Sequence, residues 1–140
     1  SFGIAKRTAT GVDYNRVALL LAVLEKRVGL QIQNQDVYIN VVGGIKVNEP
    51  SMDLGIILSV ASSFRNLPID GDVVVTGEVG LTGEIRAVSY IEKRIAECKK
   101  MGFKKIVIPK NNYAAVKDTK GIEIIPVDNL RQAINLVLRG

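Results

Sequence analysis

The chain has 140 residues, of which 47% are hydrophobic and 24% charged, as in soluble globular proteins large enough to build one hydrophobic core. It contains no histidine, and its one cysteine, Cys98, excludes an internal disulfide and leaves few ligands for a zinc site. Without histidine, any acid–base chemistry falls to Lys, Asp, Glu or Tyr. Nineteen basic against fourteen acidic residues give a net charge of +5, which fits nucleic-acid binding or solubility alone.

The first half of the chain predicts a helix, a strand and a second helix. Asp13 is expected to cap a helix over about 14–28 that is apolar on most of its circumference and ends at Gly29. The stretch DVYINVVG then alternates as a strand and enters a turn at Gly43–Gly44. The second helix starts at Ser51 or Asp53 and runs to about residue 65.

The second half continues the alternation of strands and helices. Residues 73–88 indicate a strand followed by a glycine-punctuated hairpin, and Ser89 to Glu92 is an S-x-x-E capping box that opens a helix to about 101. KKIVIP is a strand, Asn111 or Asn112 caps a brief helix, IEIIPV is the last strand, and Asp128 caps the closing helix. The longest apolar runs, at 18–24 and 55–61, are shorter than the roughly 20 residues of a membrane span.

These elements predict an α/β fold, a two-layer sandwich with a mixed sheet and packed helices. No repeat, low-complexity segment or linker interrupts the chain, so we expect a single domain over residues 1–140, whose opening is typical of a fragment of a larger protein.

The order of elements, with TGEVGLTGEIRAV before a helix and then GFKKIVIPKNN, resembles the proteolytic domain of Lon proteases. The motifs TGVDYNR, VVGG, EPSMDLGI and GEVGLTGEIR are more specific. They resemble the Lon-like C-terminal domain of the RadA (Sms) family of bacterial DNA-recombination ATPases, over almost the whole chain. The resemblance implies a missing zinc finger and a missing RecA-like ATPase domain, so zinc, ATP and magnesium are expected in those domains and no cofactor or metal in this one.

The resemblance also places the residues of the Lon catalytic dyad. The stretch NVVGGIKVNEPSMDLGIILSVASSF, residues 40–64, has the layout that presents a reactive serine, but Asp53 falls at the nucleophile position. By gap-free alignment from the hairpin, Glu92 falls where Lon has its lysine. A Ser–Lys dyad needs a hydroxyl and an amine of lowered pKa, and two carboxylates supply neither. We therefore expect no catalytic residues in this domain.

Three other interpretations of these positions remain open. Asp53 and Glu92 could form an aspartic-protease-like pair if they shared a proton at close range. Ser51 and Lys93 could form a displaced dyad, although Ser51 is also a good helix cap and Lys93 points about 100° away from Glu92. Both carboxylates also have structural interpretations, Asp53 in the first turn of its helix and Glu92 in the Ser89 capping box.

Basic residues close to the predicted turns suggest a nucleic-acid interface. Arg16 follows TGVDYN, Lys46 follows the glycine turn, and Arg86 ends the hairpin, so these three are the candidate DNA-binding residues. Each could instead be a solvated loop charge. The chain has neither a P-loop nor a G-x-G-x-x-G motif, and its seven aromatic residues are few for a base-stacking platform.

The sequence thus predicts a non-proteolytic accessory domain of a DNA-dependent ATPase or helicase in recombination and repair. The resemblance implies assembly into a ring, expected to be a hexamer, and sequence-independent binding of single- or double-stranded DNA. It also implies a cytoplasmic, nucleoid-associated protein with a RecA-type recombinase as a possible partner and no membrane contact. The alternatives are an active Ser–Lys peptidase and an assembly scaffold without DNA contact.

Overall fold

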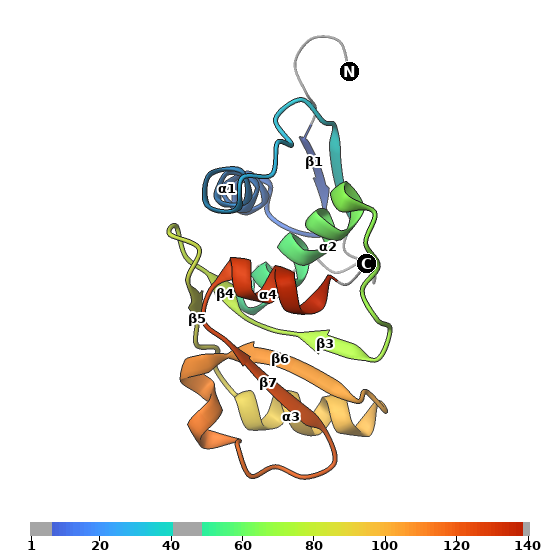
Figure 1. Ribbon diagram of the computed structural model, residues 1–140, viewed down its shortest axis with the longest axis vertical. Coiled ribbons are helices and arrows are strands. Elements are labelled where there is room, and N and C mark those ends of the chain that lie inside the picture. The colour runs from blue at the N-terminus through green and yellow to red at the C-terminus, as the bar shows by residue number, and fades with distance from the viewer. Residues whose placement is uncertain (1–6, 41–48, 139–140) are drawn as a thin grey trace. The chain divides into compact units, whose positions relative to one another are not determined.

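A computed structural model describes residues 7–40 and 49–138 of the chain (Figure 1). The chain divides into two compact units, Ser1–Glu49 and Pro50–Gly140. The expected single domain over 1–140 stays a prediction, because two compact units can still fold together as one domain.

The first unit is a pair of parallel strands connected through a helix. β1 (Arg7–Thr10) pairs in parallel with β2 (Val37–Asn40), and α1 (Tyr14–Val23) lies between them in the chain and contacts β1. Parallel neighbours need such a crossover, so this is a βαβ unit.

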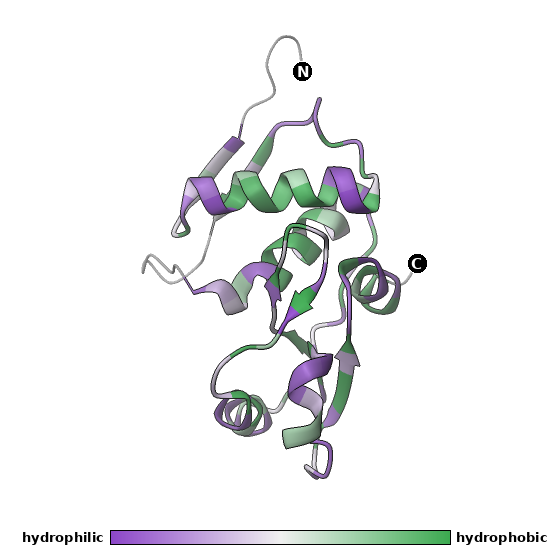
Figure 2. Ribbon diagram, turned by 90° about the vertical axis from the view of Figure 1, so that its left-hand side faces the viewer, coloured by the Kyte–Doolittle hydropathy of each residue, from purple (hydrophilic) through white to green (hydrophobic). Residues whose placement is uncertain are grey.

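The predicted ends of the first helix are confirmed. The Asp13 side chain accepts a hydrogen bond from the Arg16 backbone N–H at 3.1 Å, and Gly29 closes the helix in the left-handed conformation at φ 82°. The last turns, η1 (Leu24–Val28), are π-helical rather than α-helical. Figure 2 shows hydrophobic residues along the middle of the continuous helix formed by α1 and η1, and hydrophilic ones at its two ends. The buried side chains of the helix are Val17, Leu20, Leu21, Val23 and Leu24.

The second unit has two sheets. β3 (Val73–Val75), β6 (Lys105–Pro109) and β7 (Glu123–Val127) form a parallel sheet in the order β3-β6-β7, and β4 (Glu78–Val79) pairs antiparallel with β5 (Ile85–Arg86). The remaining elements are η2 (Pro50–Met52), α2 (Asp53–Arg65), α3 (Ile91–Lys100), η3 (Lys110–Ala115) and α4 (Leu130–Val137).

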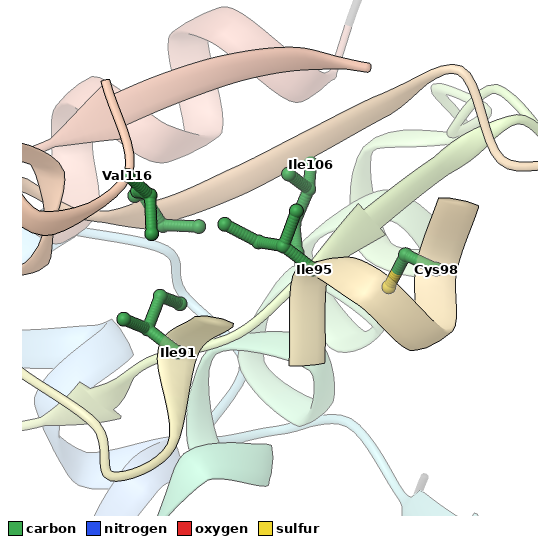
Figure 3. Packing of buried hydrophobic residues seen from close by; sticks show 6 residues of the cluster. Ile91, Ile95, Cys98, Ile106 and Val116 are labelled. Atoms are coloured by element: carbon green, nitrogen blue, oxygen red, sulfur yellow. The ribbon is translucent and has the colours of Figure 1, made fainter. Parts of the chain in front are cut away.

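Helices flank both sides of the parallel sheet in the second unit. α3 lies on one side, whereas α4, which packs on α2, lies on the other (Figures 1 and 2). Figure 3 shows the core under α3, where Ile91, Ile95 and Cys98 face Ile106 of β6 and Val116. All of β6 from Ile106 to Pro109 is buried, as expected for a central parallel strand. The predicted mixed α/β fold is confirmed.

Two of the predicted helix caps in the second unit are shifted by one residue. α3 begins after Tyr90, which adopts a left-handed conformation at φ 61° and makes no side-chain cap bond, so the predicted Ser89–Glu92 capping box is wrong. The Ser89 carbonyl accepts instead from the Arg94 guanidinium at 2.8 Å. α4 is capped by Asn129 and not by Asp128, because the Asn129 side chain accepts from the Gln132 N–H at 2.8 Å.

Two other predicted caps are replaced by tertiary contacts. Ser51 lies inside η2, and the residue before α2 is Met52, which makes no side-chain cap bond. η3 is a 3-10 helix that follows Pro109, and the Asn112 side chain does not cap it. That side chain accepts from the Val88 N–H at 2.9 Å and donates to the Val88 carbonyl at 3.0 Å, as a neighbouring strand would.

Candidate functional site

The start of α2 meets the strand β4 at a cluster of buried polar residues. Ser51, Asp53 and Thr76 are the buried polar side chains of the described residues, with exposed fractions of 7%, 1% and 6%. Burial of polar groups costs free energy unless they are hydrogen-bonded, so this cluster has a specific bonding requirement.

Backbone hydrogen bonds join the two segments directly. The Gly77 N–H donates to the Ser51 carbonyl at 3.0 Å, and the Leu54 N–H donates to the Gly77 carbonyl at 3.1 Å. The Thr76 hydroxyl also donates to the Ser51 carbonyl, at 3.4 Å. The Leu54 N–H, in the first turn of α2, thus bonds to the backbone of Gly77, and the residue before α2 makes no side-chain cap bond.

The carboxylate of Asp53 belongs to this contact. Its Oδ2 accepts a hydrogen bond from the Val79 N–H at 3.0 Å, in a setting where the side chain is almost fully buried. Asp53 also occupies the first turn of α2, as expected, where the helix dipole favours a negative charge. The group at the predicted nucleophile position is therefore a buried acceptor that ties helix to hairpin.

The close approach also depends on Gly77. A Cβ added there would lie 2.8 Å from Cγ2 of Ile85 and 3.4 Å from Cδ2 of Leu54. A larger residue would push the hairpin away from the start of α2.

Glu92 and Lys93 differ from Asp53 in their surroundings. Both are exposed on α3, and the Lys93 ammonium lies 5.4 Å from the centre of the Tyr90 ring. Ser51, the other member of the hypothetical displaced dyad, is buried with its carbonyl bound to the hairpin. The roles assigned to these residues by resemblance stay predictions.

The predicted DNA-binding residues lie in different parts of the chain. Arg16 is half-buried in the first turn of α1, in a helix and not in a turn. Arg86 ends β5 with 54% of its side chain exposed. Lys46 and the Gly43–Gly44 turn lie outside the described residues. Because Arg16 and Arg86 belong to separate compact units, a shared cationic face stays a prediction.

Sequence reasoning missed the carboxylate beside Arg86. Glu84 Oε2 pairs with Nη2 of Arg86 at 3.1 Å, and its Oε1 accepts from the Thr82 hydroxyl at 2.7 Å. The hydrogen bond from the Thr82 hydroxyl, supported by Arg86 and backbone N–H groups, lowers the pKa of Glu84 to about 2. The spacing Glu84-x-Arg86 could have indicated it, since residues two apart in an extended segment lie on one face.

The described residues also limit the kind of site. Within residues 7–40 and 49–138, no group of three or more His, Cys, Asp or Glu side chains is placed to hold a metal ion. No helix in these ranges has the length and apolar character needed to cross a membrane.

The chain is similar to a known protein family and to several curated proteins. The family described as Lon protease (S16) C-terminal proteolytic domain matches residues 21–140. The DNA repair protein RadA of Bacillus subtilis is 54% identical over 140 residues, which are 100% of this chain and 31% of that protein. The proteins of the same name from Listeria monocytogenes and Streptococcus pneumoniae are 51% and 47% identical, over 98% and 97% of this chain and 30% and 32% of their own lengths.

The chain therefore spans about a third of the length of the curated relatives it matches. The predicted resemblance to the Lon-like domain of RadA is confirmed. In the matched region, the start of α2 bonds to a glycine-rich hairpin, and parallel strands and packed helices follow. The chain belongs to the family of the Lon protease (S16) C-terminal proteolytic domain.

Proposed function

We propose that this chain is a non-proteolytic Lon-like domain that supports DNA binding and ring assembly in a RadA-type DNA repair protein. The observation that carries the proposal is Asp53, a buried carboxylate bonded to the Val79 N–H at the position where the family resemblance places the nucleophilic serine. Acyl transfer by a Ser–Lys dyad needs an exposed hydroxyl at that point.

The absence of peptidase activity can be tested with an unstructured substrate. We expect no cleavage of casein by the chain and no labelling by a serine-reactive probe. Cleavage that disappears in a Ser51→Ala variant would overturn the proposal and favour the displaced dyad of Ser51 and Lys93. Cleavage that is retained in that variant but lost in Asp53→Asn would favour an aspartic mechanism.

The DNA contact is assigned to Arg16, Lys46 and Arg86. About three phosphate contacts predict weak binding whose logarithm falls with log salt at a slope of roughly −2 to −3. The triple change of these residues to Ala should weaken binding of single-stranded and duplex oligonucleotides alike, because phosphate contacts carry no sequence information. The control is Lys99→Ala with Lys100→Ala, two exposed cations at the end of α3.

A scaffold without DNA contact is the competing function. It would be favoured if the triple variant of a full-length protein carrying this domain bound DNA as tightly as its parent across a salt series. In the full-length protein we assign ATP and magnesium to a RecA-like ATPase domain and zinc to a zinc finger. We place the protein at the nucleoid in the cytoplasm, where a RecA-type recombinase is the proposed partner.

A further inference from the structure

The carboxylate of Glu84 holds two parts of the β4–β5 hairpin at once. Its Oε1 accepts hydrogen bonds from the Thr82 N–H at 3.1 Å and from the Thr82 hydroxyl at 2.7 Å. Its Oε2 accepts from Nε of Arg86 at 3.4 Å and from Nη2 of Arg86 at 3.1 Å. The tip of the hairpin and the Arg86 side chain are therefore fixed to one group.

Backbone hydrogen bonds close the hairpin and join it to the start of α4. The Gly80 N–H donates to the Glu84 carbonyl at 2.9 Å, and the Gly83 N–H donates to the Gly80 carbonyl at 3.0 Å. The Leu130 N–H, at the start of α4, donates to the Gly83 carbonyl at 2.7 Å. A Cβ at Gly80 would collide with the Glu84 carboxylate, so glycine at this position makes room for it.

The geometry of the ion pair leaves one edge of the guanidinium for a ligand. Glu84 occupies the edge formed by Nε and Nη2, so the outer edge formed by Nη1 and the second Nη2 hydrogen points away from the carboxylate. With 54% of its side chain exposed, Arg86 can present that edge to a phosphate as a bidentate donor.

We propose that Glu84 is a positioning residue for DNA, which holds the Arg86 guanidinium so that its outer edge takes a backbone phosphate. The inference rests on the DNA binding proposed above. Free arginine side chains lose rotamer freedom when they bind, and a side chain that is already ordered loses less. Because the pKa of Glu84 is lowered to about 2, the carboxylate stays ionised wherever DNA binding is measured.

The proposal and simple electrostatics predict opposite signs for Glu84→Gln. The change raises the net charge from +5 to +6, which by itself strengthens attraction to DNA. If Glu84 positions Arg86, binding instead weakens by roughly twofold to tenfold, the effect of ordering one rotamer-rich side chain. Fluorescence anisotropy with labelled single-stranded and duplex oligonucleotides at low salt measures the sign. Glu97→Gln, the same charge change at an exposed site on α3, should leave binding unchanged or slightly tighter.

A shorter side chain at residue 84 separates the effect of positioning Arg86 from the effect of the carboxylate charge. Glu84→Asp keeps the net charge at +5 but cannot reach Thr82 and Arg86 together, so it should weaken binding in the same direction as Glu84→Gln. Glu84→Asp also provides the test of positioning if circular dichroism shows that Glu84→Gln is poorly folded. In an Arg86→Ala background, neither change at Glu84 should weaken binding further, because the group it positions is gone.

Each outcome decides the question. Weaker binding by both Glu84 variants, together with no further weakening by either Glu84 change in an Arg86→Ala background, supports the proposal. Binding as tight as or tighter than the parent, or equal weakening without Arg86, overturns it while the DNA-binding function stands. A parent chain with no salt-dependent binding at all overturns the proposed function, and the role of Glu84 with it.

Discussion

At the scale of single residues, two carboxylates make structural hydrogen bonds in different surroundings. Asp53 is buried and bonded to the Val79 N–H, whereas Glu84 is 42% exposed and bonded to Thr82 and Arg86. Burial makes the first bond expensive to lose, because an orphaned backbone N–H in the interior has no water to replace its partner. The second set of bonds is exposed to solvent and contributes little to stability, so its main effect is to orient the Arg86 side chain.

Replacing Asp53 should therefore destabilise the fold. We expect Asp53→Ala to lower the free energy of unfolding by about 1–3 kcal/mol, since the Val79 N–H loses its acceptor in a buried setting. Urea denaturation measures the change. Asp70→Ala removes an exposed aspartate and should cost about 0.5 kcal/mol or less. Equal losses in the two variants would contradict a structural role for Asp53.

Glu84 should make a pH-dependent contribution to stability. In the folded chain the pKa of Glu84 is lowered from 4.5 to about 2, so its contribution is present above the ordinary pKa and is lost as pH falls toward 2. Solvent screening limits the contribution of such an exposed pair to about 0.2–1 kcal/mol. The parent should be more stable than Glu84→Gln near pH 7, and the difference should vanish near pH 2. A stability difference that stays constant over this range in urea titrations would argue against the pair.

At the scale of elements, the starts of the helices are set by different partners. α1 begins with a side-chain cap from Asp13, α2 begins on the backbone of Gly77, and α4 begins with a reciprocal pair. In that pair Asn129 accepts from the Gln132 N–H, while the Gln132 side chain accepts from the Asp128 N–H at 2.7 Å. The helix start and the residue before it are thus fixed together.

The cap of α4 can be assigned by comparing two adjacent variants. Asn129→Ala should lower the free energy of unfolding by about 0.5–2 kcal/mol, because it removes the acceptor of the Gln132 N–H. Asp128→Ala should cost less, since residue 128 bonds through its backbone: its N–H donates to Gln132 and its carbonyl accepts from the Ile85 N–H. Thermal unfolding of both variants ranks them, and a larger loss for Asp128→Ala would show that the side chain one residue earlier is the cap.

Hydrophobic periodicity sufficed to predict most elements, but local sequence did not suffice for the caps. The helix at 14–28 follows from its apolar positions, and the strands at 73–75 and 105–109 follow from short runs of β-branched residues, both of which are local features. The box at Ser89 failed because Arg94 takes the Ser89 carbonyl and α3 starts after Tyr90. At the candidate site, resemblance located Asp53, but its bond to Val79, 26 residues away, depends on tertiary folding that no local pattern encodes.

At the scale of the whole molecule, the chain combines two compact units with a net charge of +5. Each unit contains parallel strands connected through helices, which need long-range pairing to form. The proposed ring requires a head-to-tail contact between neighbouring copies whose rotation closes the ring.

Assembly should therefore depend on concentration. We expect static light scattering of this chain to show a weight-average mass that rises above that of a monomer as concentration increases. The Lys99→Ala, Lys100→Ala control should behave like the parent. A strictly monomeric species up to the highest soluble concentration would refute an intrinsic ring contact in this chain and assign ring formation to the rest of the full-length protein.

The buried thiol of Cys98 can serve as a natural probe for the opening of the core under α3. Cys98 is the one cysteine of the chain, it is buried beside Ile95 and Ile106, and burial raises the pKa of its thiol (Figure 3). A thiol-reactive reagent should modify it slowly while α3 packs on β6, because the thiol is buried and its raised pKa leaves little of the reactive thiolate. The rate of labelling, followed over denaturant concentrations, therefore reads the opening of this one helix in a chain that needs no engineered probe.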